Sequence, residues 1–255
     1  MRPARFVTAV VTAVLTVVAL GGAAAAAGPG AAGPDGPGVA LDQISVGTHN
    51  SFRGAGSFER FAGVIGWQEV NEPEDRAKLD NRLGAEYATF YPADGPAKAV
   101  PISWRVERFQ KVASGSVRTH DGEAGVTPAR YVNWVMLELR GSGTRFIVVN
   151  THFISGAWSG HPERQARWLR HYEVLRDTVA ELRRNHPRQP VFVVGDFNRH
   201  QAVELPAPIR YVPVQGGGQV PLDHMYAPSD ISHSLVERLP LWGSDHHAYR
   251  MFATF

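Results

Sequence analysis

An α+β fold is what the sequence predicts, and three observations support that prediction. Short runs of branched and aromatic residues alternate with turns marked by glycine and proline, a pattern typical of strands. One later segment repeats apolar residues at helical spacing. Residues 41–255 are numerous enough for one domain with a substantial core and too few for two comfortable ones, so we expect a single domain.

The start of the chain has the pattern of a secretory signal peptide. Two arginines precede the apolar run 6–20, and small residues follow as far as Ala27. Because the run is shorter than the roughly 20 residues that span a bilayer, we expect residues 1–27 to be removed, leaving a secreted protein without a stable membrane span. The alternative is an uncleaved anchor, since the alanines could extend an apolar helix. Residues 28–40 are almost only glycine, alanine and proline, which predicts a flexible leader.

The composition excludes some chemistries and leaves others open. The chain has no cysteine, which excludes zinc-thiolate sites, cysteine nucleophiles and disulfides. Its net charge of +2 includes the two arginines of the predicted signal peptide, and without them 24 basic residues face 24 acidic ones. A neutral domain gives no general support for a polyanionic substrate, although a local basic patch is compatible with it.

The expected strands carry the branched and aromatic residues that suit a pleated surface. Five are predicted, at 44–48, 64–70, 131–139, 145–150 and 190–195. Several end directly in polar residues, whose side chains therefore point into the loops where functional sites are built.

One helix is predicted between Pro162 and Asn185. Its apolar residues recur at helical spacing, from Trp168 to Leu182, until Asn185 and the following His-Pro end the pattern. The other face mixes arginines with acidic residues, which favours a solvated surface over a nucleic-acid contact.

Acids, amides and imidazoles gather in five short segments at the strand ends. These are Gly-Thr-His-Asn at 47–50, Gly-Trp-Gln-Glu-Val at 66–70, Val-Asn-Thr-His-Phe at 149–153, Val-Gly-Asp-Phe-Asn at 194–198 and Ser-Asp-His-His at 244–247. Each segment alone is equally compatible with a strand-end cap or a structural hydrogen bond.

Together, and in this chain order, the segments resemble the endonuclease/exonuclease/phosphatase superfamily, the deoxyribonuclease-like phosphodiesterases. The resemblance covers residues 44–249 and is most specific at 195–198 and 244–246, with Leu-Asp-His at 222–224 as a further match. It implies a four-layer αββα sandwich, in which two mainly antiparallel sheets pack together with helices outside. The site would then lie at one edge of the sandwich.

The resemblance also implies roles for individual residues. Catalytic roles fall to His152, Asp196, Asn198, Asp223 and His246, metal binding to Asn50, Glu69 and Asp245, and contact with a substrate phosphate to Arg130. Asp196 would accept a proton from the attacking water, and Asn198 would orient the same group or a phosphate oxygen. His152 and His246 would stabilise the developing charge. Asp223 would pair with His246. A hard cation held mainly by Glu69 is expected, with Mg²⁺ favoured and Mn²⁺ or Ca²⁺ as alternatives.

Some segments depart from the family pattern. The interval between Asn50 and Glu69 is short, so we expect the first helix to shrink to a turn or two within 57–62. Residues 101–105 look like the family's edge strand. Trp158 could stack on a base, lie against a lipid headgroup or cover the core, and these alternatives stay open.

The other histidines are expected to matter less. His49 stands where many family members have tyrosine, so it could touch the site or serve packing alone. Six more are expected in surface or loop positions: His120, His161, His171, His186, His200 and His233.

Phosphodiester hydrolysis is the chemistry that these observations share. We favour extracellular nucleic acid as the substrate and expect a monomer. A phospholipid or sphingomyelin phosphodiesterase, or a phosphatase, on the same scaffold is the main alternative. A catalytically silent binding protein ranks third, because none of the expected site residues is missing.

Overall fold

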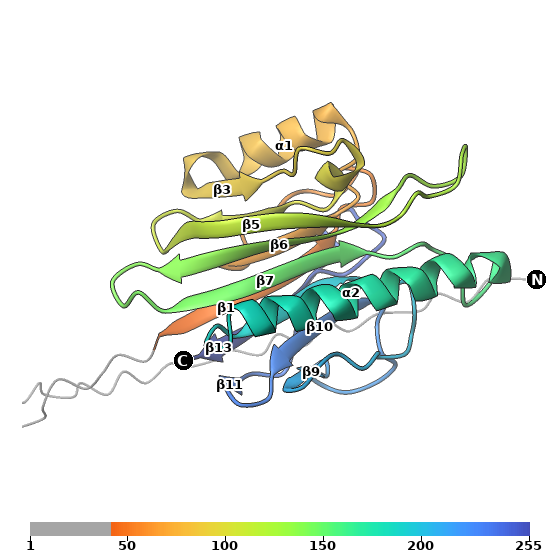
Figure 1. The fold of residues 1–255 in the computed structure, drawn as a ribbon. Helices are drawn as coiled ribbons and strands as arrows, with labels where there is room; N and C mark the ends of the chain where they lie inside the picture. The colour runs from red at the N-terminus through yellow and green to blue at the C-terminus, as the bar shows by residue number, and fades with distance from the viewer. Residues whose placement is uncertain (1–41) are drawn as a thin grey trace, which may run out of the picture. The chain divides into compact units, whose positions relative to one another are not determined.

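Two β-sheets pack face to face in the computed structural model, which describes residues 42–255 (Figure 1). Apolar side chains of both sheets form the main core between them, with Val46 and Ile102 from one sheet in the same cluster as Val148 and Phe192 from the other. The predicted signal peptide and the leader lie outside the described residues.

The first sheet has the strand order β11-β13-β1-β2-β4-β3, and β12 also pairs with β13. Its strands are β1 (Gln43–Asn50), β2 (Val64–Gln68), β3 (Tyr87–Phe90), β4 (Ile102–Arg105), β11 (Ser232–His233), β12 (Glu237–Arg238) and β13 (Tyr249–Thr254). β1 and β2 run parallel, and the other pairs are antiparallel. The prediction of an edge strand at 101–105 was wrong, because β3 pairs with the free side of β4 and becomes the edge itself.

The second sheet has the order β5-β6-β7-β8-β10-β9. Its strands are β5 (Phe109–His120), β6 (Arg130–Leu139), β7 (Arg145–His152), β8 (Val191–Asp196), β9 (Ile209–Tyr211) and β10 (Asp223–Pro228). Only β7 and β8 pair in parallel. All five strands predicted from the sequence are present in the two sheets, with ends shifted by one or two residues.

A helix covers the outer face of each sheet, which completes the four layers predicted for the fold (Figure 1). α1 (Pro73–Leu83) packs Leu79 against the first sheet, and α2 (Gln165–Asn185) packs Trp168 against the second. Short 3-10 helices occupy Gly84–Glu86, Pro96–Ala99 and Pro162–Arg164. Within residues 42–255, no helix combines the length and the hydrophobicity needed to cross a membrane.

The helix expected within 57–62 does not form. Phe58 instead packs edge-on against Trp67 at 5.3 Å between ring centroids, and the amide of Ser57 donates to the carbonyl of Trp242 at 2.8 Å, so the segment is held in an irregular conformation. The first helix follows Glu69 rather than preceding it. Its position escaped prediction because its face toward the sheet carries few apolar residues, although a proline and two acids mark its first turn.

Candidate active site

Four strands bring their carboxyl ends to one edge of the sandwich. Asn50 ends β1 beside Gln68 of β2, and His152 ends β7 beside Asp196 of β8. The strands of each pair run parallel. The polar side chains at the end of one strand therefore lie next to the polar side chains at the end of the neighbouring strand. Asp223 opens the antiparallel strand β10 directly opposite Asp196. The motifs found in the sequence therefore meet in space.

Buried amides join the two sheets beneath this edge. The Gln68 amide donates to Asn150 Oδ1 at 2.7 Å, and the Asn150 amide donates to the carbonyls of Trp67 at 2.8 Å and Pro101 at 3.0 Å. A side chain at Gly66 would come within 2.7 Å of Asn150 Oδ1, so glycine is needed for this approach. The contacts fix the strand ends immediately before Glu69 and His152.

Asp196 is the carboxylate around which the site is arranged. Its Oδ1 accepts the backbone N–H of Asn198 at 2.8 Å, and its Oδ2 accepts the amide of Asn50 at 2.9 Å. Nε2 of His152 lies 3.4 Å and Nε2 of His246 lies 3.9 Å from the same Oδ2. Burial, followed by the charge of Asp223, raises the pKa of Asp196 to about 7.

The chain before Asp196 needs a glycine. Gly195 has φ 145°, and a Cβ there would collide with the carbonyl oxygen of Thr151. The close passage of β8 along β7 at this point places Asp196 beside His152.

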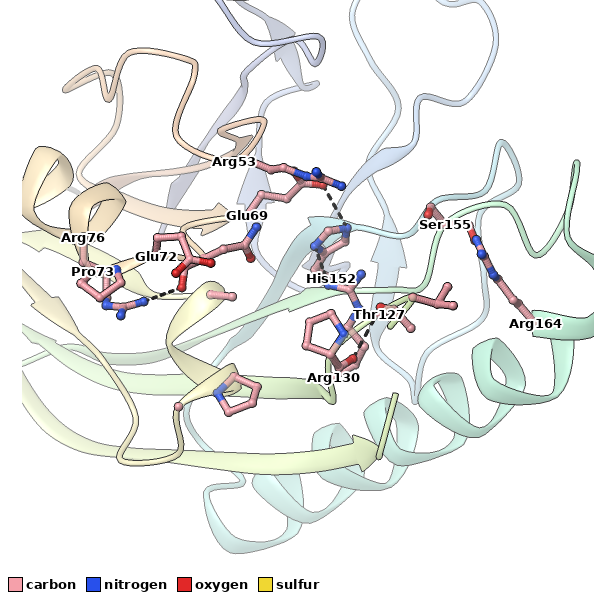
Figure 2. Close-up of a pocket in the computed structure, with 16 residues that line it drawn as sticks. Arg53, Glu69, Glu72, Pro73, Arg76, Thr127, Arg130, His152, Ser155 and Arg164 are labelled. Carbon is pink, nitrogen blue, oxygen red and sulfur yellow. Dashed lines mark hydrogen bonds and ion pairs between the residues drawn. The ribbon is translucent and has the colours of Figure 1, made fainter. Parts of the chain in front are cut away.

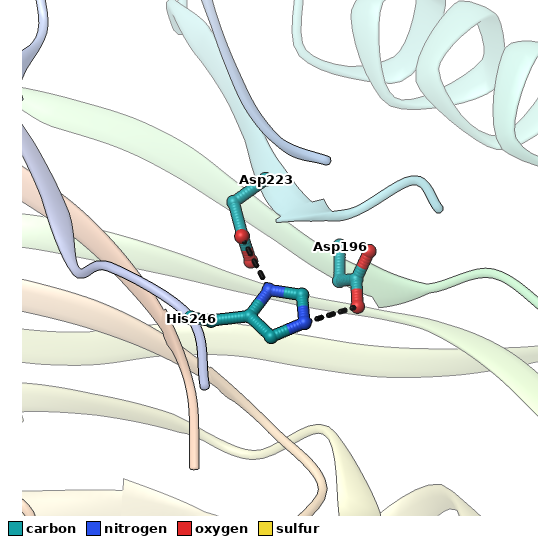
Figure 3. Close-up of side chains that lie close together, drawn as sticks. All are labelled: Asp196, Asp223 and His246. Carbon is teal, nitrogen blue, oxygen red and sulfur yellow. Dashed lines mark hydrogen bonds and ion pairs between the residues drawn. The ribbon is translucent and has the colours of Figure 1, made fainter. Parts of the chain in front are cut away.

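His246 and Asp223 form the shortest ion pair of the site. Nδ1 of His246 lies 2.6 Å from Oδ2 of Asp223, as the resemblance implies, and Figure 3 shows the imidazole between Asp223 and Asp196. Burial opposes protonation of His246, but the charges of Asp223, Asp196 and Asp245 outweigh it and raise its pKa to about 10. The imidazole is therefore cationic at neutral pH.

His152 is in the opposite charge state. Burial, and then the positive charge of Arg130, hold its pKa well below the ordinary value. Arg130 Nη1 lies 3.2 Å from His152 Nδ1 and must be the donor, so Nδ1 accepts and the ring proton resides on Nε2. That N–H faces Asp196 and also lies 3.9 Å from a carboxylate oxygen of Glu69.

The remaining expected residues surround this centre. Asn50 Oδ1 accepts the backbone N–H of Phe52 at 3.0 Å, so its amide orients Asp196 directly. The side-chain amide of Asn198 donates to the carbonyl of Phe153 at 3.1 Å. Asp245 is 54% exposed at its side chain and reaches within 4.0 Å of His246.

Oxygen atoms suited to a hard cation are present at the site. Asp196, Asp223 and His246 have potential ligand atoms within 4.8 Å of one another, but Asp223 Oδ2 and His246 Nδ1 are already bonded to each other. Glu69 and Asp245 are partly exposed and contact the site only at 3.9 and 4.0 Å, which leaves their oxygens able to bind an ion. The donor set fits a divalent cation that keeps several water ligands.

A cleft of about 700 Å³ borders the centre on the side of Glu69 and His152 (Figure 2). Glu69, Arg130 and His152 lie on its wall, together with residues from the start of α1 and from the segment before α2. A substrate in this cleft would therefore lie beside the side chains of His152 and Glu69.

The structure decides the positions of His49 and Trp158, which the sequence left open. His49 is fully buried in a cage of Phe61, Trp67 and Trp242, which favours packing over contact with the site. Trp158 covers Trp168 edge-on at 5.4 Å, although 38% of Trp158 remains exposed.

The expectation that His171 lies at the surface was wrong, because it is fully buried in α2 and bonds Thr151 at 2.6 Å. Its spacing from Trp168 and Leu175, both on the buried face of the helix, could have indicated this. His120 also differs from expectation, since it lies on β5 with a buried Nε2.

Comparison with known proteins identifies the family. The model of the Endonuclease/Exonuclease/phosphatase family matches residues 29–246. The chain belongs to this family. Comparison with curated protein sequences gives no match.

Several solved structures share the fold at low sequence identity. A mannosyl-6-phosphatase of Bacteroides thetaiotaomicron is 15% identical, with a TM-score of 0.66 over 83% of this chain and 100% of that one. Truncated TDP2 of Caenorhabditis elegans is 16% identical, with a TM-score of 0.65 over 84% and 98% of the two chains. The human Nocturnin catalytic domain, solved with a bound sulfate anion, is 17% identical, with a TM-score of 0.60 over 84% and 98%.

Proposed function

We propose that this chain is an exported, divalent-metal-dependent phosphodiesterase whose substrate is nucleic acid. Its family makes it a hydrolase of phosphoric esters. The observation that supports the hydrolytic mechanism is the environment of Asp196. This carboxylate has a raised pKa and lies beside an amide and two imidazoles of opposite charge state.

Asp196 accepts the proton of the attacking water in this proposal. A carboxylate serves as a general base most effectively when its pKa lies near the working pH, and that of Asp196 is raised toward it. The hydrogen bonds from Asn50 and from the backbone of Asn198 fix both oxygens, so the carboxylate keeps one orientation.

The two imidazoles stabilise the charge that develops on the phosphate. His246 supplies a cationic N–H, and Asp223 maintains its protonation. His152 supplies a neutral N–H whose tautomer is fixed by Arg130. Preorganised donors of this kind lower the barrier because they need no reorganisation during the reaction.

Glu69 and Asp245 would hold a divalent cation. When bound, such an ion supplies positive charge to the phosphate oxygens during displacement. Mg²⁺ is our first candidate, because the available ligands are oxygens and the exposed position leaves room for its water molecules.

Nucleic acid is the favoured substrate because the cleft concentrates positive charge in an otherwise neutral domain. Four arginines and two glutamates line it. One protein with this fold is a mannosyl-6-phosphatase, so the fold alone does not select nucleic acid as the substrate.

A substrate panel tests the proposal. The full chain is incubated with plasmid DNA, RNA, sphingomyelin liposomes and a phosphomonoester, each with Mg²⁺, Mn²⁺, Ca²⁺ or EDTA. We expect cleavage of nucleic acid that EDTA abolishes and that Asp196→Asn and His246→Gln each reduce at least about 100-fold. Asp177→Asn, on the exposed face of α2, serves as the matched control. Cleavage of the liposomes alone would support the lipid phosphodiesterase instead.

Export is tested separately. N-terminal sequencing of protein recovered from the medium of an expressing culture should give a new terminus near Ala27. Retention in the membrane fraction with an intact first residue would contradict the proposal.

A further inference from the structure

We infer that the cleft binds a chain of phosphodiesters and contacts one phosphate on each side of the bond that is cut. The inference rests on the proposed function and narrows it to the cleavage of internal bonds in nucleic acid. It starts from the four arginines that line the cleft, which are Arg53, Arg76, Arg130 and Arg164.

None of these four arginines forms an ion pair with a carboxylate among the described residues, and they outnumber the two glutamates of the cleft. Within residues 42–255, none of them has an acidic oxygen within 4.0 Å, whereas arginines elsewhere do, such as Arg60 with Glu86 at 2.6 Å. The charged residues of the domain balance overall, so this grouping is local. Unpaired charge in a concave surface attracts anions more strongly than the same charge on a convex one.

Two of the arginines are positioned by backbone carbonyls. Arg76 Nη1 donates to the carbonyls of Asn71 at 2.8 Å and Val70 at 3.4 Å, and Arg164 Nη1 donates to the carbonyl of Ser155 at 3.1 Å. A carbonyl orients a guanidinium without cancelling its charge. The other N–H groups of each guanidinium remain able to donate to phosphate oxygens.

The two positioned arginines lie on opposite sides of the catalytic residues. Figure 2 shows Arg76 on the α1 side and Arg164 on the side that leads to α2, with Glu69 and His152 between them. A phosphodiester chain that crosses the centre would therefore meet one arginine before the reacting phosphate and the other after it. A lipid phosphodiester or a sugar monophosphate carries one phosphate and could not engage both.

The test compares substrates with and without flanking phosphates, using the full chain and the metal that activates it. A thymidine dinucleotide has only the bond to be cut, whereas an oligothymidylate of eight residues has phosphates on both sides. We expect kcat/KM to rise by about tenfold for each flanking phosphate bound. In a plot of the logarithm of kcat/KM against that of the salt concentration, two extra contacts to a single strand should make the slope steeper by about 1.4 for the longer substrate than for the dinucleotide.

Variants assign the contacts to the arginines. Arg76→Gln and Arg164→Gln should each raise KM for the longer substrate roughly tenfold and make the salt slope shallower by about 0.7. Arg76→Lys and Arg164→Lys keep the charge and should retain most of the wild-type salt slope. This comparison distinguishes the loss of a charge from a disturbance of the structure. Arg170→Gln, on the exposed face of α2 and paired with Glu173, is the matched control and should behave as the wild type.

The outcomes separate the two proposals. If no diester is cleaved with any metal, the proposed function fails and the inference fails with it. If diesters are cleaved but the dinucleotide and the longer substrate give equal kcat/KM, or if both glutamine variants keep the wild-type salt slope, the inference alone is overturned.

Discussion

Nδ1 of His246 lies 2.6 Å from Oδ2 of Asp223, and this contact decides the charge of the imidazole. Both side chains are largely shielded from water, with exposures of 15% and 3%. In such surroundings an unpaired cation would be strongly disfavoured, and it is the charge of Asp223 and its hydrogen bond that raise the pKa of His246. Its second nitrogen faces Asp196, which makes the cation available to a phosphate bound there.

Replacing Asp223 should shift the alkaline side of the pH profile. The wild-type pKa of His246 is about 10, and Asp223→Asn removes the charge that raises it, so kcat/KM should begin to fall at lower pH. The measurement is kcat/KM against pH on a soluble diester for both proteins. If the alkaline limbs of the two profiles coincide, protonated His246 is not the form that the reaction requires.

The same pair predicts a pH-dependent stability. Folding raises the pKa of His246 above its ordinary 6.5, so its contribution to the free energy of unfolding is fully present below about pH 6.5 and is lost as pH rises through about 10. Urea unfolding at pH 6 and above pH 10 measures the free energy of unfolding of the wild type and of Asp223→Asn. The difference between the two proteins should be smaller at the higher pH. A constant difference would indicate that the ion pair is not responsible.

Asn50 should control the acidic side of the profile. Its amide donates to Asp196 at 2.9 Å, so Asn50→Asp replaces a donor with a second negative charge and raises the pKa of Asp196 further. The acidic limb of kcat/KM should move to higher pH, with a loss of roughly tenfold or more at neutral pH from the misplaced base. Asn185→Asp, exposed at the end of α2, should leave the profile unchanged.

Much of the site was predictable because the relevant residues directly follow apolar strands. Asn50, His152 and Asp196 each end a strand of a parallel pair. The strand pattern located these residues at strand ends, whereas their meeting at one edge was implied by the family resemblance. α1 was missed for the converse reason. Leu79 and Leu83 are its buried apolar residues, too few for a periodic pattern, and its position depends on Trp67 from a neighbouring strand.

The charge states could not be obtained from the sequence. His152 and His246 have the same ordinary pKa and both follow polar motif residues. They differ because Arg130 reaches one ring and Asp223 the other, and both contacts join different strands or loops through the fold. Carbonyl groups likewise position Arg76 and Arg164 in the cleft. These contacts depend on the geometry of the loops, which cannot be predicted from residue type alone.

His171 should prove to be a structural residue of the core. Thr151 Oγ1 donates to the carbonyl of Tyr131 at 3.0 Å, so it accepts the Nε2–H of His171 at 2.6 Å. Thr151→Val leaves that N–H unsatisfied and should lower the free energy of unfolding by about 1–3 kcal/mol. The double variant with His171→Leu should lose less than the sum of the two single variants, because the pair is removed together. Strict additivity in urea unfolding would show that the two side chains do not interact.

Glu69 should determine the affinity for the metal ion. Its carboxylate lies 3.9 Å from His152 and is partly exposed, so Glu69→Gln removes a negative ligand without opening a cavity. We expect the activating concentration of Mg²⁺ to rise roughly 10- to 100-fold, and the increase in melting temperature that Mg²⁺ gives the wild type to shrink. Glu72→Gln is the matched control, since Glu72 lines the same cleft and is implied in no metal contact. An equal loss of Mg²⁺ affinity in both variants would show that the ion responds only to the overall charge of the cleft. A loss of affinity confined to Glu69→Gln would identify Glu69 as a ligand.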